Sequence, residues 1–171
     1  GWADALILLG IPYDSDQAVR LAEEIMSAVT DEARGMSAEL AEARGPFPLF
    51  GESIYRDQDR PRRNATVTTL APTGSIALLA GCSSGIEPLF AVAFTHTVRR
   101  PEGDRVLQIV NPLFEQIARE RGFYSQELMA DVARAGAVRG LPGVPEDIQR
   151  LFGTAHEIDL EWHIRHQAAY Q

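Results

Sequence analysis

A turn of small and hydroxyl-bearing residues is the part of this sequence best suited to chemistry. Pro72-Thr73-Gly74-Ser75 follows the β-branched residues 66–69 and precedes a short apolar run at 76–80. The pattern predicts a strand, a loop and the N-terminus of a helix. Such a loop directs several backbone N–H groups and two hydroxyls at one point, where phosphate commonly binds. We therefore expect the chain to handle phosphorylated small molecules; an ordinary strand-to-helix connection is the alternative.

A second pattern nearby suggests a different chemistry. Residues 81–85 read Gly-Cys-Ser-Ser-Gly and contain Gly-x-Ser-x-Gly, the pattern around the nucleophile of α/β-hydrolases. Ser83 would be that nucleophile, with His96 or His156 as its base. The pattern requires a strand, a sharp turn and a helix, but Pro88 follows Ser83 by five residues, where the helix should continue. The sequence therefore disfavours a hydrolase.

Two further residues of this loop region have side chains that can do chemistry. Cys82 is the single cysteine, and no basic residue near it in sequence would lower the pKa of its thiol. We expect a buried, inert thiol rather than a reactive one. Glu87 lies in an apolar stretch before Pro88, where a carboxylate either acts in a site or caps local backbone amides. The sequence leaves both interpretations of Glu87 open.

Histidines and arginines form two weaker candidates. His163 and His166 are three residues apart on one helical face, with His156 upstream. A tight metal site adds a carboxylate or cysteine at matching geometry, so we expect a packed or solvated helix face and no metal. Arg99 and Arg100 follow a predicted strand and carry charges that can bind phosphate. Adjacent strand residues point to opposite faces, so at most one of them faces any given site.

The composition limits the function classes. The chain has 171 residues, 45% hydrophobic and 23% charged, which suits one globular domain. Its net charge of −8 argues against broad binding to nucleic acids or membrane surfaces. All 16 basic residues are arginine, so a Walker-type phosphate loop, which needs lysine, is excluded. A single cysteine makes no internal disulfide, and we expect a reducing, cytoplasmic setting. The chain opens without Met, so we expect the native start to lie upstream.

Helices are the main elements available to position these candidate residues, because helical patterns dominate the sequence. Apolar residues recur at helical spacing from Ser15 or Asp16 to the Gly45-Pro46 stop, with Gly35 as a point where the helix could break in two. Residues 46–63 predict a long surface loop. The remaining expected elements are a helix at 2–9, strands at 89–98 and 105–110, and helices from Asn111 to Gly122, Ser125 to Ala135, after Pro145, and from Asp159 to Gln171.

Long motifs in this sequence resemble the large, catalytic subunit of ribonucleotide reductases. The resemblance is strongest in residues 64–76 and 80–90, whose sequence is most similar to that of the class II, adenosylcobalamin-dependent branch. It covers nearly the whole chain, because similar segments flank these on both sides: residues 10–15, 108–112, 119–125, 154–158 and 161–163. A reductase of another radical class is the nearest alternative, since the phosphate turn is shared.

The resemblance implies a fold and a site. The family has an α/β fold, a ten-stranded α/β barrel. Residues 1–171 are expected to be a single fragment of the barrel domain, truncated at both ends and helix-rich in isolation. In this family the Pro-Thr-x-Ser/Thr turn holds the substrate phosphates, a role that falls here on Thr73, Gly74, Ser75, Ile76 and Ala77. Cys82 and Glu87 are candidates for lining the same site.

The resemblance also implies an activity that this segment does not carry alone. The family reduces ribonucleotides to 2′-deoxyribonucleotides by thiyl-radical chemistry, with adenosylcobalamin as the class II cofactor. The expected partners are a ribonucleoside di- or triphosphate, a thioredoxin-type reductant and a second copy in a homodimer. The class II radical cysteine lies in an Asn-Pro-Cys-Gly-Glu segment, which is missing here, as is the C-terminal cysteine pair. We therefore expect no catalytic residue in this segment. A non-catalytic phosphate-binding or regulatory module is the alternative function.

Overall fold

A computed structural model describes residues 1–57, 60–99, 103 and 105–171. It is helix-rich, and its strands form one two-stranded sheet in the described ranges. The elements are α1 (Trp2–Leu8), α2 (Asp16–Arg44), the 3-10 helix η1 (Phe50–Glu52), α3 (Gly74–Ala80), β1 (Ala93–Val98), β2 (Arg105–Val110), α4 (Pro112–Glu120), α5 (Gln126–Ala135), α6 (Glu146–Leu151) and α7 (Leu160–Tyr170). Among these helices, none combines the length and apolar composition needed to cross a bilayer.

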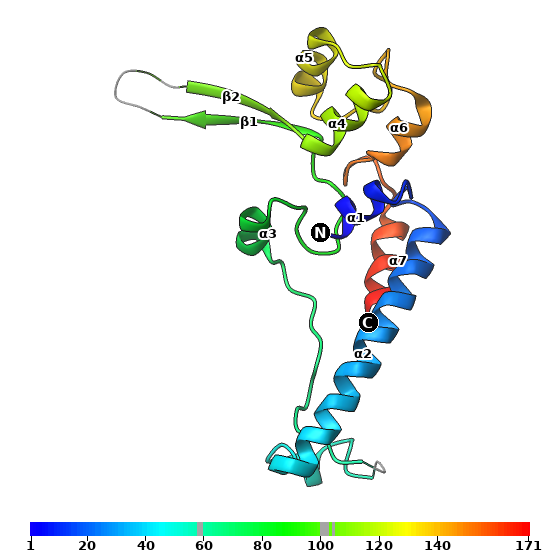
Figure 1. Cartoon of the computed structure of the whole chain (residues 1–171), viewed down its shortest axis with the longest axis vertical. Coiled ribbons are helices and arrows are strands. Elements are labelled where there is room, and N and C mark those ends of the chain that lie inside the picture. Colours follow the sequence, from blue (N-terminus) through cyan, green and yellow to red (C-terminus); the bar gives the residue numbers. More distant parts are fainter. Residues whose placement is uncertain (58–59, 100–102, 104) are drawn as a thin grey trace.

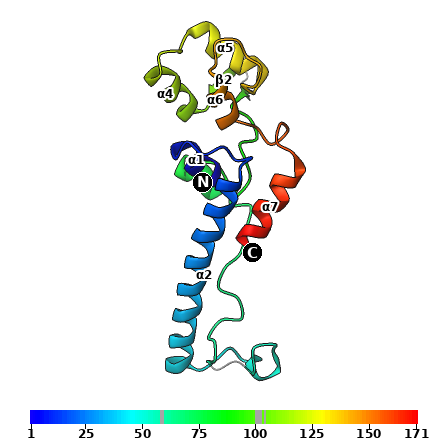
Figure 2. The same ribbon diagram turned by 90° about the vertical axis from the view of Figure 1, so that its right-hand side faces the viewer.

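The molecule is elongated along α2, the longest helix (Figure 1). Helices α4 to α6 gather at one end, and the β1–β2 hairpin projects from that group. Helix α7 packs beside the first half of α2, which both views show. Helix α3 lies apart from the other helices on a long connection, and the segment before it runs beside α2 (Figure 2).

Local signals in the sequence explain where α2 begins and ends. The Ser15 side chain accepts a hydrogen bond of 3.2 Å from the Ala18 N–H, which caps the first turn. Gly45 ends the helix with a φ of 78°, a conformation that glycine adopts without strain. The expected break at Gly35 is wrong, because α2 is continuous. One glycine inside a helix costs only about 1 kcal/mol relative to alanine, and the packing of Ser37 and Ala38 offsets it.

Two hydrophobic cores hold the fold, and α1 contributes to both. The first core lies among α4, α5 and α6, and Ala3 and Ile7 reach it from α1. Its largest fully buried side chains are Phe114 and Phe152. The second core joins the other face of α1, with Trp2 and Leu6, to the first turns of α2 and to α7. Helix α1 therefore connects the α4–α6 group to the long helix.

A polar junction lies between these cores. Arg139 donates from Nη2 to the Asp14 carboxylate over 3.0 Å and from Nη1 to the Glu157 carbonyl over 2.8 Å. The other oxygen of Asp14 is buried and has no hydrogen bond in the described part of the chain. The nearest recorded cation to it is Arg150, whose Nε lies 3.9 Å away. The Asp14–Arg139 pair thus ties the loop before α2 to the loops on either side of α6.

The expected strand at residues 66–69 is wrong, since these residues form no ladder in the structure. A strand needs a hydrogen-bonded neighbour, and the described residues supply none for this segment. Strand β1 starts at Ala93 rather than Leu89, which makes one isolated parallel bridge with Thr154. β1 pairs antiparallel with β2, and Phe94 lies opposite Ile109. The helix-rich character expected of the chain is confirmed, while the complete barrel lies beyond what these elements show.

Candidate functional site

The predicted phosphate turn forms the N-terminus of α3. Thr73 precedes the helix with φ 51° and ψ 21°, and among the described residues it is the one non-glycine with positive φ. This conformation is unusual for a β-branched residue, and such strain concentrates at functional sites. The expectation that a loop leads into a helix here is confirmed by α3.

The first backbone N–H groups of α3 are available to a ligand. Ala77 N–H bonds the Thr73 carbonyl over 2.9 Å. Within the described ranges, the N–H groups of Gly74, Ser75 and Ile76 have no acceptor, as expected for the first turn of a helix. These three residues are exposed, whereas Ala77 is buried. The turn therefore presents unpaired donors to its surroundings at the positive end of a short helix.

The Thr73 hydroxyl ties this turn to the loop at residues 81–88. Its Oγ1 accepts a hydrogen bond of 3.1 Å from the Gly85 N–H. Cys82 N–H bonds the Ala77 carbonyl over 3.1 Å, so the loop also contacts the turn at its other end. The sequence predicted a buried Cys82, and this is wrong, because the thiol is exposed. The residues beside Cys82 are small, and its Sγ lies 3.6 Å from where a Cβ on Gly1 would be.

The hydrolase interpretation of Ser83 fails on its context. Residues 76–80, which would be the strand before the nucleophile, belong to helix α3. Ser83 Oγ accepts a hydrogen bond from the Asp4 N–H over 3.1 Å, and its own N–H donates to the Asp4 carboxylate over 2.7 Å. Ser83 therefore holds α1 and the loop together.

Glu87 is exposed, and its carboxylate folds back over Gly85. Gly85 has a φ of 57°, and a Cβ on it would collide with this carboxylate. Burial, and secondarily the Glu87 charge, raises the pKa of the Tyr13 phenol far above its usual value. The Tyr13 hydroxyl donates to the Ile86 carbonyl over 3.0 Å. Glu87 is thus an exposed carboxylate of the loop that lies against the backbone of Gly85.

The histidine side chains that the structure describes do not converge on one another as a metal site. His166 is fully buried and accepts at Nδ1 from the Trp2 indole N–H over 3.2 Å. Its Nε2 lies 3.0 Å from the Tyr13 carbonyl and must be the protonated nitrogen, because the indole only donates. Both ring nitrogens are thereby occupied. His156 is exposed against Phe90, and no group of three potential metal ligands occurs in the described parts of the chain.

The structure describes one of the two adjacent arginines. Arg99 is exposed after β1. Arg100, and the side chain of His96, lie outside the residues that the structure describes.

The buried His166 predicts a loss of stability in mild acid. Burial, and to a lesser extent the charges of His163 and Arg165, lowers the pKa of His166 below its usual 6.5. The unfolded chain therefore binds the proton more readily, so stability is complete above about pH 6.5 and falls as the pH drops through the folded-state pKa. We expect the free energy of unfolding to fall by up to about 1.4 kcal/mol per pH unit in that window.

Urea denaturation at a series of pH values measures this effect. His156→Gln, at an exposed position, is expected to keep the same pH slope. A slope that is unchanged when His166 itself is replaced by leucine would contradict the assignment.

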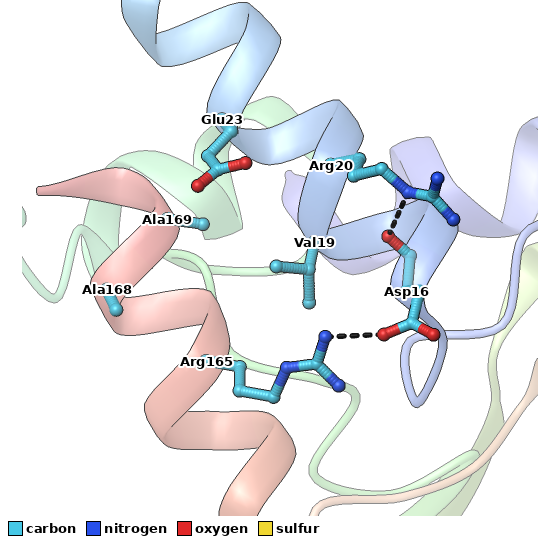
Figure 3. A pocket seen from close by; sticks show the side chains of 7 residues that line it. All are labelled: Asp16, Val19, Arg20, Glu23, Arg165, Ala168 and Ala169. Atoms are coloured by element: carbon cyan, nitrogen blue, oxygen red, sulfur yellow. Dashed lines mark hydrogen bonds and ion pairs between the residues drawn. The ribbon is translucent and has the colours of Figure 1, made fainter.

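A cavity of about 540 Å³ lies between α2 and α7 (Figure 3). Two of its lining side chains are arginines, and Asp16 engages both. Arg165 pairs with the Asp16 carboxylate, and Arg20 Nε donates to the Asp16 backbone carbonyl over 3.3 Å. Because these guanidinium groups already have acceptors within the chain, this cavity is a weaker anion site than the turn.

Comparison with known proteins identifies the family. The family model described as "Ribonucleotide reductase, barrel domain" matches residues 1–61 and 58–171. The chain belongs to this ribonucleotide reductase family. It is 50% identical over its full length to a vitamin B12-dependent ribonucleoside-diphosphate reductase of Mycobacterium tuberculosis strain CDC 1551 and 47% identical to one of Thermoplasma acidophilum. The resemblance that the motifs at 64–90 indicated is thereby confirmed.

A solved structure supports the same relationship. The class Id ribonucleotide reductase alpha subunit of Actinobacillus ureae matches 99% of this chain with a TM-score of 0.78 and 25% identity, and the match covers 29% of that subunit. The chain spans about a quarter of the length of the curated relatives, 24% and 22% for the two reductases above.

Sequence reasoning missed the residues that hold the turn in place. Asp4 lies 79 positions before Ser83, so no local spacing links them. Tyr13 was likewise overlooked, although it reaches Ile86 across the fold. A polar residue in the first turn of an otherwise apolar helix was the only signal for Asp4.

Proposed function

We propose that this chain supplies the substrate-phosphate-binding turn of a vitamin B12-dependent ribonucleoside-diphosphate reductase. The observation that carries the proposal is the set of exposed backbone N–H groups at Gly74, Ser75 and Ile76, which have no acceptor among the described residues. The names of the relatives at 50% and 47% identity support the reaction and favour a diphosphate substrate.

The turn binds phosphate through complementary donors. The backbone N–H groups at the start of α3 donate to phosphate oxygens, and the helix dipole adds attraction for the negative charge. Thr73 Oγ1 already accepts from Gly85, so its own hydrogen remains free to donate outward. The exposed Ser75 hydroxyl is a second donor. Gly74 has no heavy atom within 4 Å of where its Cβ would lie, which lets a phosphate approach the backbone closely.

The segment before the turn is proposed to be a strand of the complete α/β barrel. Residues 66–69 are β-branched and form no strand ladder with any described residue. A segment whose backbone N–H and C=O groups lack strand partners is suited to pair with another strand. Ile76, Leu78 and Leu79 of α3 are 63%, 83% and 87% exposed, far more than an apolar helix tolerates in a complete protein. The rest of the catalytic polypeptide would cover them, and residues 1–171 are one fragment of that barrel domain.

The relatives' names bring vitamin B12 into the proposal, and adenosylcobalamin supplies the radical when it is bound. The described residues do not form a corrinoid site by themselves: the cavity between α2 and α7 is about 540 Å³, and a second one, beside Gly10, Arg121 and Asp147, is about 570 Å³, both too small for a corrinoid. A thioredoxin-type reductant, a homodimer and a cytoplasmic setting complete the proposal, and this segment alone is expected to be inactive.

Ser75→Ala in the full-length enzyme tests the proposed role. We expect the affinity for a ribonucleoside diphosphate to fall by about 1–3 kcal/mol, the scale of one lost charge-assisted hydrogen bond. Equilibrium titration measures it, with Ser84→Ala as the matched control, because Ser84 is also exposed in the neighbouring loop. Equal affinities for the wild type and Ser75→Ala would count against the proposal, and absence of thiol-dependent nucleotide reduction by the wild type would favour a non-catalytic phosphate-binding module.

A further inference from the structure

We propose that Asp4 and Ser83 are positioning residues for the phosphate-binding turn. They act through the loop at residues 82–85, which connects α1 to both ends of the turn. The inference rests on the proposed function, because it concerns how the same turn is held in shape.

Asp4 and Ser83 form two reciprocal hydrogen bonds between distant segments. The Asp4 carboxylate accepts from the Ser83 N–H over 2.7 Å, and Ser83 Oγ accepts from the Asp4 N–H over 3.1 Å. Gly1, which precedes α1, offers no side chain to cap the helix. Ser83 therefore acts as the missing cap from another part of the chain, and both residues are partly buried. A bond pair of this kind fixes the loop relative to the helix axis.

Gly85 transmits this fixation to the turn. Its carbonyl accepts from the Trp2 N–H over 3.4 Å, and its N–H donates to Thr73 Oγ1 over 3.1 Å. On the other side of Ser83, the Cys82 N–H bonds the Ala77 carbonyl over 3.1 Å. The four-residue loop is thus attached to α1 through Ser83 and Gly85, and to α3 through Cys82 and Gly85.

The base of this connection is rigid. Trp2 and Leu6 of α1 are buried in the second core, and Ala3 and Ile7 are buried in the first. A helix held on both faces gives the loop a fixed support. Gly74 to Ile76, the middle of the turn, are exposed, and their N–H groups have no acceptor among the described residues. The geometry of the turn therefore depends on the loop contacts more than on its own packing.

The Thr73 contact has the most direct consequence for phosphate. Thr73 holds a left-handed conformation that a β-branched residue does not favour. The Gly85 N–H occupies one lone pair of its Oγ1, which orients the hydroxyl hydrogen away from the loop. If Asp4 is removed, Ser83 and Gly85 gain freedom, and Thr73 loses both its orientation and its support.

Binding measurements on the full-length enzyme test this inference. For Asp4→Ala we expect the Kd for a ribonucleoside diphosphate to rise roughly five- to tenfold, because the Ser83 N–H loses its carboxylate acceptor, one of the two reciprocal hydrogen bonds. The Kd of inorganic pyrophosphate, used as a competitor, should rise by the same factor. Affinity for the unphosphorylated ribonucleoside should stay unchanged. Asp4→Asn keeps an acceptor oxygen for the Ser83 N–H and should restore nucleotide affinity.

Controls separate positioning from general stability. Asp131→Ala removes a carboxylate from an exposed pair with Arg134 on α5 and should change no affinity. Ser83→Ala removes the other bond, in which Ser83 Oγ accepts from the Asp4 N–H, and should also weaken phosphate binding. The double variant, which lacks both bonds, should bind phosphate at least as weakly as either single one. Equal loss of affinity for nucleoside and nucleotide, or a failure of Asp4→Asn to rescue, would overturn the inference in favour of a structural role.

The failure of this inference is distinguishable from failure of the proposed function. If Ser75→Ala weakens binding of pyrophosphate while Asp4→Ala does not, the turn binds phosphate but Asp4 does not position it. If neither variant changes pyrophosphate binding, the phosphate role of the turn itself is wrong.

Discussion

Replacement of Phe114 by alanine is expected to lower the free energy of unfolding by about 3–5 kcal/mol, because it removes a large side chain from a packed interior. Phe114 is fully buried in α4, and its ring meets the edges of Phe152 and Phe123 at centroid distances of 5.2 and 6.1 Å. Urea denaturation followed by tryptophan fluorescence and circular dichroism measures the loss.

Phe90→Ala is the matched control for this prediction. Phe90 is 76% exposed and touches His156 at a centroid distance of 5.1 Å. Its removal from the 171-residue chain should change stability by less than about 0.5 kcal/mol, as for other surface substitutions. Equal losses for the two phenylalanine variants would mean that the α4–α6 core is not packed as described.

Replacement of His166 by leucine should also destabilise the chain strongly, by about 2–6 kcal/mol, since two buried polar partners are left unsatisfied. The Trp2 indole N–H and the Tyr13 carbonyl both bond to this ring. Leucine is of similar size, so the expected loss comes from the missing hydrogen bonds rather than from a cavity.

Double variants distinguish this cause from poor packing. Trp2→Phe removes the indole donor and should lessen the additional cost of His166→Leu, because the two residues share a hydrogen bond. His156→Leu, on the surface, is the control for replacing a histidine. Additive losses for Trp2→Phe and His166→Leu would contradict the assigned bond.

Helix starts that depend only on neighbouring residues could be predicted from the sequence. Ser15, Asn111 and Ser125 each cap the helix that their residue types suggested, with side-chain oxygens accepting from backbone N–H groups. Such caps are local and can be read from a few residues. The continuity of α2 through Gly35 could not be read from neighbouring residues. The helix is contacted there by a distant segment, in which the Arg63 N–H bonds the Ser37 carbonyl.

Features that depend on residues far apart in the chain could not be predicted from the sequence alone. Residues 66–69 have the composition of a strand, yet no strand among the described residues pairs with them. Cys82 was expected to be buried and inert because no basic residue lies near it in the sequence, but burial depends on what packs over the loop. The turn at Thr73 to Ala77 was found through its motif, whereas its support from Asp4 appeared only in the fold.

A structure of the full-length enzyme with a bound ribonucleoside diphosphate tests the phosphate role of the turn most directly. We predict phosphate oxygens within about 2.7–3.2 Å of the backbone nitrogens of Gly74, Ser75 and Ile76, the range of ordinary hydrogen bonds. A diphosphate bound elsewhere, with these N–H groups paired to carbonyls of the completed protein, would contradict the account.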